Sequence, residues 1–173
     1  MDIESLCSGM SGENDDMIKA VMRDYAEMIY RIALSQLKNI YDAEDAFQEV
    51  FVRYIKSNKD FESDEHAKAW LIRVTLNCCK KLRGTAYFRH AAPFDELEEE
   101  PSDDGGIEKS EVYCAVMELP PKYRTIIHLF YYEDMPTAEI GRILKMKQST
   151  VASQLHRARN ILRQKLREEY DYE

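Results

Sequence analysis

The stretch TAEIGRILKMKQSTVASQLHRARNILRQKLR, residues 137–167, has the pattern of two helices joined by a tight turn. Apolar residues recur at helical spacing on both sides of a short Lys-Met-Lys segment. Two helices that cross steeply need a small residue where their backbones approach, which Gly141 supplies, and an apolar plug in the turn, which Met146 supplies. The stretch therefore predicts a helix-turn-helix, with one helix over 137–144 and a longer one from about Ser149.

The second of these helices has a polar, basic outer face. Hydroxyl and amide side chains can read base edges in the major groove, arginine can pair with guanine, and flanking basic residues can hold phosphates. A basic helix can also be a solvated face or a docking surface for an acidic partner, but here the turn pattern and the polar side chains coincide on one element. We predict binding of duplex DNA through Ser149, Thr150, Ser153, Gln154, His156, Arg157 and Arg159.

The distribution of charge along the chain supports this prediction. The formal net charge is −8, which is unusual for a protein that binds nucleic acid. Residues 95–111, however, read DELEEEPSDDGGIEKSE, whereas residues 142–167 contain many lysines and arginines and no carboxylate. Local charge, more than the total, decides contact with phosphates.

Three amphipathic helices are predicted upstream. Apolar residues recur at three-and-four spacing over residues 17–37 and again over residues 42–56. A third helix is expected from Ser63 or Asp64, either of which can cap it, to about Leu82. This third helix carries a basic stripe opposite its apolar one.

Two shorter helices are expected just before the helix-turn-helix. The first ends at the pair Pro120-Pro121, because proline cannot continue a helix. The second runs from Pro121 to about Tyr132, since proline is well tolerated at a first helical position.

A segment without periodicity divides the chain. Residues 91–106 are acidic and contain two prolines and a pair of glycines, which favours a linker. No strand alternation or hairpin signal appears anywhere. We therefore predict an all-α chain of two small helical domains, 17–90 and 107–173, with a disordered segment over residues 1–16.

The composition argues against several classes of protein. No apolar run approaches the roughly 20 residues that a membrane span needs, and the start of the chain lacks a secretory pattern, so we expect a cytoplasmic location. The cysteines show no Cys-x-x-Cys spacing, so we expect reduced thiols packed in the core and no metal site. They are Cys7, Cys78, Cys79 and Cys114. No phosphate-binding glycine loop or nucleophile elbow is present, so we expect no catalytic residues, cofactor or small-molecule substrate.

Three blocks in a fixed order resemble a known family. They are AEDAFQEVFVRYI, HAKAWLIRVTLNCCKKLR and, after the acidic linker, LPPKYRTIIHLFYYEDMPTAEIGRILKMKQSTVASQLHRARNIL. Together they resemble the extracytoplasmic-function (ECF) group of bacterial sigma-70-type sigma factors, over nearly the whole chain. The resemblance implies an RNA polymerase initiation factor that directs promoter recognition, DNA melting and transcription initiation. It also implies that 17–90 is a sigma-2-like domain and 107–173 a sigma-4-like domain.

The resemblance implies two sites in the first domain. The clamp helices of the largest polymerase subunit would be bound by Asp42, Asp45, Gln48, Glu49 and Val52. The opened strand of the minus-10 element would be bound by Lys59, Asp60, Phe61, Arg73, Asn77, Lys80 and Lys81. An aromatic side chain beside basic residues suits unpaired bases. Trp70 could also stack on a base, but its core-period position favours packing.

In the second domain, Ser153, His156 and Arg157 align with family positions that contact the minus-35 element. Ala152 and Gln154 stand where a basic residue is frequent in the family, so the contacts usual there are not expected. Pro136 replaces the usual capping serine, which should alter how the first helix of the motif begins. The partners implied are core RNA polymerase, at its clamp helices and flap, promoter DNA and an anti-sigma protein.

Two other interpretations remain. A helix-turn-helix regulator with an N-terminal sensing or dimerisation domain would explain the C-terminal third equally well, but not the AEDAFQEVF and AWLIRVTLN blocks. It predicts tight binding to duplex DNA without polymerase. A carboxylate-bridged metalloenzyme would use Glu44, Asp45 and Glu49, but such bundles need Glu-x-x-His pairs, and no histidine of the chain has a glutamate three residues before it.

Overall fold

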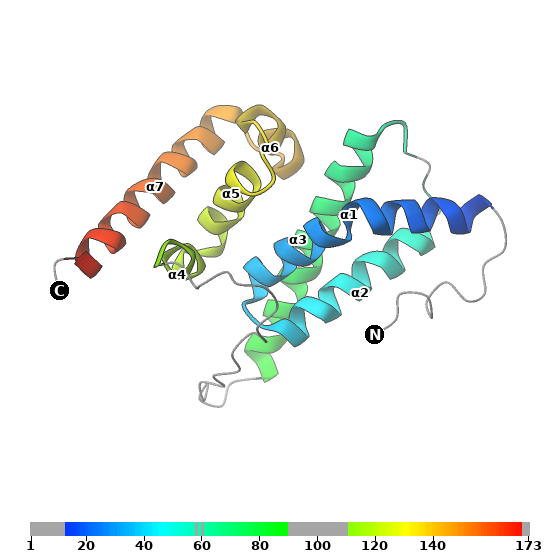
Figure 1. Cartoon of the computed structure of the whole chain (residues 1–173), viewed down its shortest axis with the longest axis horizontal. Helices are drawn as coiled ribbons and strands as arrows, with labels where there is room; N and C mark the ends of the chain where they lie inside the picture. The colour runs from blue at the N-terminus through cyan, green and yellow to red at the C-terminus, as the bar shows by residue number, and fades with distance from the viewer. Residues whose placement is uncertain (1–12, 58, 60, 90–110, 171–173) are drawn as a thin grey trace.

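The computed structural model describes residues 13–57, 59, 61–89 and 111–170, and all regular secondary structure in these ranges is α-helical (Figure 1). This confirms the predicted all-α class. The helices are α1 (Glu13–Leu37), α2 (Ile40–Ser57), α3 (Asp64–Arg89), α4 (Glu111–Glu118), α5 (Pro121–Tyr131), α6 (Thr137–Leu144) and α7 (Gln148–Tyr170). None of the helices in the described ranges is long and apolar enough to cross a membrane.

Helices α1, α2 and α3 pack against one another and form the first half of the molecule. Their apolar stripes meet in a core whose largest side chains include Ile29, Phe51 and Leu71, each at most 1% exposed. The start of α3 is capped as expected, because the hydroxyl of Ser63 accepts the N–H of His66 at 3.2 Å. The buried stripes predicted from helical periodicity are therefore the ones that form this core.

Two predicted helix boundaries in this half are wrong. Helix α1 begins at Glu13, so residues 13–16, which we placed in a disordered segment, are helical. Helix α3 continues past Gly84 to Arg89 instead of ending near Leu82. One glycine costs a helix only about 1 kcal/mol relative to alanine, too little to end a helix by itself. The predicted linker, 91–106, lies outside the described residues.

Helices α4 to α7 form the second half. Helix α4 ends before the Pro120-Pro121 pair, and α5 begins with Pro121 at its first position, as predicted. Helix α6 begins at Thr137 directly after Pro136, whose side chain makes no capping hydrogen bond. The helix therefore begins at the expected place without a side-chain cap.

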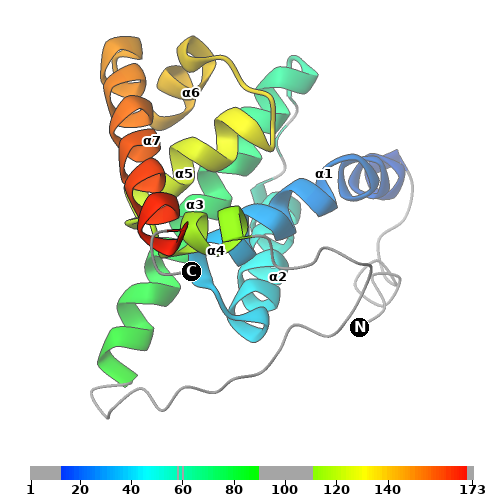
Figure 2. The same ribbon diagram turned by 60° about the vertical axis from the view of Figure 1, so that its left-hand side comes forward.

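The two halves pack against each other. Helix α5 lies beside α1, and α6 contacts α3, as the two views in Figures 1 and 2 show. Buried side chains of both halves belong to one continuous hydrophobic cluster, from Met22 to Ala158. The structure therefore shows the two helical units in a closed arrangement.

Candidate nucleic-acid and polymerase interfaces

Helices α6 and α7 form the predicted helix-turn-helix. The turn is closed by a 2.8 Å hydrogen bond in which the N–H of Met146 donates to the carbonyl of Gly141. Behind the turn, Val151 and Leu155 of α7 are buried, as are two isoleucines of α6. This core fixes the angle between the helices and leaves the outer face of α7 toward solvent.

The outer face of α7 presents most of the predicted reading side chains. The exposed ones are Ser149, Thr150, Ser153, His156 and Arg157, while Gln154 is half-buried. The hydroxyl of Ser153 donates to the carbonyl of Ser149 at 2.8 Å, which keeps an acceptor lone pair outward. No acidic residue lies in the first turn of α7, so the positive end of its helix dipole is free to favour phosphate.

Arg159 lies apart from this set. Its Nε donates to the hydroxyl of Tyr131 at 2.8 Å, and its guanidinium lies over the rings of Phe130 and Tyr131. Cation–π contact and a hydrogen bond tie the side chain to α5. The structure thus brings Arg159 to the surface between α5 and α7, and its role in reading DNA stays a prediction.

This same surface holds a groove that the sequence did not predict. It has a volume of about 580 Å³ and lies between α4, α5 and α7. Its walls are mainly apolar, with Val112, Tyr131 and Tyr132 about half exposed on them. Arg163 and Arg167 line the α7 side. The signal in the sequence was the presence of these large apolar residues beside a helical core stripe, but periodicity alone cannot separate a groove wall from a core.

The predicted polymerase-docking face lies on α2, on the side away from its buried stripe. Asp45 is exposed, whereas Asp42, Gln48, Glu49 and Val52 are half-buried. Glu49 accepts a 2.7 Å hydrogen bond from Arg53 one turn along, and this bond lowers the pKa of the Glu49 carboxyl. The face therefore keeps its negative charge, partly offset by a neighbouring guanidinium.

The predicted minus-10 surface divides between a loop and α3. On α3, Asn77, Lys80 and Lys81 are exposed and Arg73 is half-buried. In the loop, the ammonium of Lys59 lies 5.6 Å from the centre of the Trp70 ring. Asp60 lies outside the described residues.

Aromatic rings gather at the loop end of α3. Phe61 stacks on Tyr54, with ring centres 5.9 Å apart and planes 9° apart, and also contacts Trp70 at 5.6 Å. Trp70 is half-buried in this cluster, in line with the expected packing role. The predicted loop residues Lys59 and Phe61 therefore both lie against the ring of Trp70.

The cysteines fulfil the packing expectation only in part. Cys78 and Cys79 are buried, and burial raises the pKa of Cys79 to about 12. Cys114 is exposed on α4, so its predicted core position is wrong, because a short helix with one buried side turns this residue outward. Cys7 lies outside the described residues. Within the ranges that the structure describes, no three His, Cys, Asp or Glu side chains are grouped to hold a metal ion.

Comparison with protein-family models gives two matches in sequence order. Sigma-70 region 2 matches residues 21–89, and Sigma-70, region 4 matches residues 109–162. The first match covers most of α1 and all of α2 and α3, and the second covers α4, α5, α6 and most of α7.

Curated relatives match along most of the chain. The ECF RNA polymerase sigma factor SigW of Bacillus subtilis is 28% identical over 171 residues, covering 90% of this chain and 91% of that protein. The ECF RNA polymerase sigma factor SigE of Mycolicibacterium smegmatis is 30% identical over 152 residues, covering 83% of this chain and 59% of that protein.

Two solved structures share the fold. The sigma factor RpoE of Bartonella quintana, in complex with the anti-sigma factor NepR, aligns with a TM-score of 0.68 at 20% identity, over 86% of this chain and 96% of that one. CnrH, in complex with the cytosolic domain of CnrY, aligns with a TM-score of 0.65 at 20% identity, over 94% and 93%.

Proposed function

Since the chain belongs to the ECF group of the sigma-70 family of RNA polymerase sigma factors, we propose that it directs core polymerase to promoters and opens them for initiation. The observation that carries this proposal is the presence of both sigma regions in one chain, each with a polar face turned outward from its core. A helix-turn-helix regulator is less well supported, because residues 21–89 match sigma region 2.

We assign docking on the polymerase clamp helices to the α2 face. Asp45 and Glu49 lie one turn apart on it and can pair with basic side chains of a coiled coil, while Val52 adds apolar area. Asp42 and Gln48 complete the surface. Charge pairs at the rim of such an interface mainly speed association and select the partner.

We assign binding of the opened minus-10 strand to the loop between α2 and α3 and to α3 itself. Lys59, Asn77 and Lys80 can follow the phosphate backbone, and Arg73 and Lys81 add positive charge beside them. The proposal for Asp60 and Phe61 is that they help to hold an unpaired base. The ring cluster beneath Phe61 would stiffen that end of the site.

We assign recognition of the minus-35 element to the outer face of α7. Arg157 and His156 are exposed where a recognition helix contacts base edges, and Ser149, Thr150, Ser153 and Gln154 lie nearer its N-terminus. Insertion of this end in the major groove also points the helix dipole at phosphate.

We assign binding of the polymerase flap to the groove between α4, α5 and α7. An apolar groove with a basic wall suits an amphipathic helix that has acidic flanks. Because one solved structure of the same fold is a complex with an anti-sigma factor, an anti-sigma protein is the further partner that we propose. We assign no catalytic activity to the chain itself and propose that it acts in the cytoplasm.

Two measurements test this function. In run-off transcription with purified core polymerase, the chain should initiate from a subset of genomic promoter fragments, and failure on all of them would exclude the proposal. In co-purification with core polymerase, Asp45→Arg should weaken binding. Asp24→Arg makes the same charge change at an exposed position of α1 and should bind like the wild type. Equal loss in both variants would exclude the α2 face as the docking surface.

A further inference from the structure

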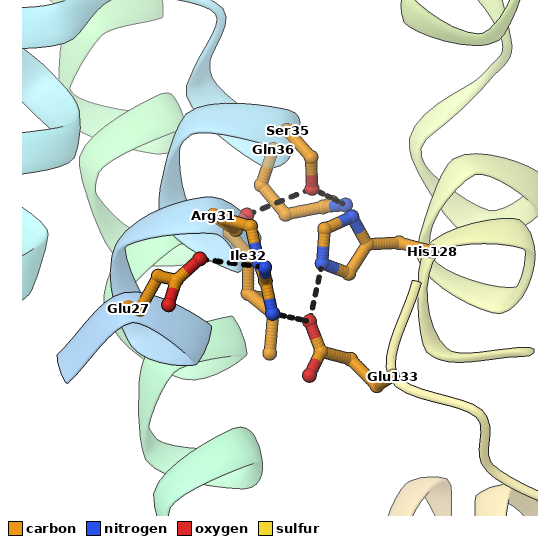
Figure 3. Close-up of polar contacts among 7 residues, drawn as sticks. All are labelled: Glu27, Arg31, Ile32, Ser35, Gln36, His128 and Glu133. Atoms are coloured by element: carbon orange, nitrogen blue, oxygen red, sulfur yellow. Dashed lines mark hydrogen bonds and ion pairs between the residues drawn. The ribbon is translucent and has the colours of Figure 1, made fainter. Parts of the chain in front are cut away.

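An ion pair joins the two halves of the molecule. Nη2 of Arg31 on α1 lies 3.4 Å from Oε1 of Glu133, which follows α5. The same carboxylate oxygen lies 3.2 Å from Nε2 of His128 (Figure 3). The Arg31 guanidinium also forms an ion pair with the carboxylate of Glu27, one turn earlier on α1, at 2.8 Å. The Glu133 side chain is only 6% exposed, so in the closed arrangement this carboxylate has little contact with water.

A buried carboxylate is stable only when it is paired. Burial alone would raise the pKa of Glu133, but the hydrogen bond with His128 and the charge of Arg31 outweigh it, and Lys68 of α3 adds to them. The resulting pKa lies below the ordinary value, so Glu133 is charged near neutral pH. Removal of one partner leaves a desolvated charge, which strongly favours a state in which Glu133 meets water again.

More polar side chains line the same contact. Ser35 and Gln36 of α1 are buried, and Figure 3 shows them beside His128. The hydroxyl of Ser35 donates to the carbonyl of Ile32 at 2.9 Å, and the Gln36 amide contacts that hydroxyl at 3.5 Å. Interfaces between domains that carry polar groups separate more readily than apolar cores do.

Like charges meet elsewhere along the contact. Burial lowers the pKa of Lys38, at the end of α1, and the charges of Arg124 and Lys165 from the second half lower it further. Burial likewise lowers the pKa of Arg124, and Arg83 of α3 lowers it too. Glu118 pairs with Lys165 and offsets part of this repulsion. The two halves are therefore attracted at Glu133, whereas near Lys38 the second half presents charges of both signs, two positive and one negative.

We propose that the contact of Arg31 with Glu133, which His128 of the same half as Glu133 supports, is a latch that holds the free factor closed. The role of this latch in transcription rests on the proposed function. The minus-10 and minus-35 elements lie about 25 base pairs apart, which is about 85 Å at 3.4 Å per base pair. A compact chain of 173 residues has a radius of gyration of about 16 Å. The closed form cannot contact both elements, so the latch must open before initiation.

The side chain of Tyr132 lies between the latch and the groove and contacts His128. The ring of Tyr132, which lines the groove, stacks on His128 with centres 5.1 Å apart and planes 13° apart. A segment that fills the groove therefore contacts a residue that packs on the latch. This arrangement gives polymerase a physical route to release the closed form when it occupies the groove.

The test measures opening by labelling a thiol introduced at the interface. Ser35→Cys places a nearly isosteric thiol in the buried contact, in a background with Cys7→Ser and Cys114→Ser. The reaction of this introduced thiol with a disulfide reagent then reports the population of the open form, even when that population is small. Cys78 and Cys79 lie in the core of the first half, so their labelling reports unfolding of that half instead.

We expect Arg31→Gln and Glu133→Gln each to speed labelling of the introduced thiol about 3- to 10-fold, without faster labelling of the two core cysteines. The double variant should add little, because both changes remove one shared interaction. Glu27→Gln should leave the rate nearly unchanged, since Glu27 contacts Arg31 without crossing to the second half. Lys38→Glu should slow labelling in the Arg31→Gln background.

Unchanged labelling in both Arg31→Gln and Glu133→Gln would overturn the latch. A joint rise at the introduced thiol and at the core cysteines would also overturn it, because the contact would then only stabilise the fold. Neither outcome depends on polymerase or DNA, so failure of the latch is distinguishable from failure of the proposed function.

Discussion

The backbones of Gly141 and Met146 approach each other closely at the turn of the helix-turn-helix. A β-carbon at position 141 would lie 2.8 Å from the carbonyl oxygen of Met146, and the nearest atoms beyond it belong to the backbone of Gln148. Backbone atoms of the turn cannot rotate away as a side-chain end can. The geometry of the motif therefore depends on the absence of a side chain at this position.

Gly141→Ala should destabilise the protein by about 1–3 kcal/mol, because the turn must shift to admit the methyl group. Urea unfolding followed by circular dichroism measures this change. The matched control is Gly84→Ala in α3, where an added β-carbon meets nothing within 4 Å. There the lower backbone entropy of alanine should stabilise by about 0.5–1 kcal/mol. Shifts of the same sign in both variants would contradict the steric argument.

Lys145 ends α6 in the left-handed region, at φ 55° and ψ 44°. A side chain is strained in this conformation and glycine is not. Lys145→Gly should therefore raise the free energy of unfolding by about 0.5–1 kcal/mol. Lys145→Ala, which also loses the charge but keeps a β-carbon, should give no such gain. A larger gain from alanine than from glycine would show that charge, not backbone strain, governs this position.

Helix ends and core faces could be predicted because their causes are local. Proline at 121, the cap at Ser63 and the small residue at Gly141 each act within a few positions of the chain. The end of α3 could not be predicted in this way. Gly84 disfavours a helix by only about 1 kcal/mol relative to alanine, and the rest of the helix outweighs that cost.

The contact between the two halves could not be read from the sequence at all. Arg31 and Glu133 are separated by 102 positions, and Arg31 looks like an ordinary surface charge of a helix while Glu133 looks like one of a loop. The groove was missed for a related reason. Val112 lies on α4 and Tyr132 directly after α5, and only their packing around α7 makes them one wall.

The thiols should differ sharply in reactivity. Thiolate is the reacting form, and burial raises the pKa of Cys79 to about 12 and raises that of Cys78 as well. In a Cys7→Ser chain, a disulfide reagent should label Cys114 fast and the two buried thiols only on unfolding. Urea that unfolds the protein should release them together. Fast labelling of Cys79 in the folded chain would mean that the core of the first half opens readily.

Arg157→Ala tests how the second half reads DNA. If the guanidinium pairs with a base, the variant should lose about 1–3 kcal/mol of discrimination at one promoter position. If it contacts phosphate, binding should weaken uniformly and the salt slope should fall by about 1. Arg159→Ala is the comparison, since Arg159 is tied to Tyr131. Unchanged promoter preference and salt slope in Arg157→Ala would exclude both roles.

Glu133 should make stability depend on pH in a defined direction. Although burial raises its pKa, His128, Arg31 and Lys68 together hold that pKa below the ordinary value of about 4.3. A carboxyl of lowered pKa adds stability above the ordinary value and loses it as pH falls through the lower, folded-state value. The free energy of unfolding of wild type minus that of Glu133→Gln should therefore be largest near neutral pH and shrink below about pH 4. Urea unfolding from pH 7 to pH 3 measures this difference, with Glu27→Gln as the control for the loss of an exposed partner of Arg31. A difference that stays constant down to pH 3 would mean that Glu133 does not carry its charge in the closed form.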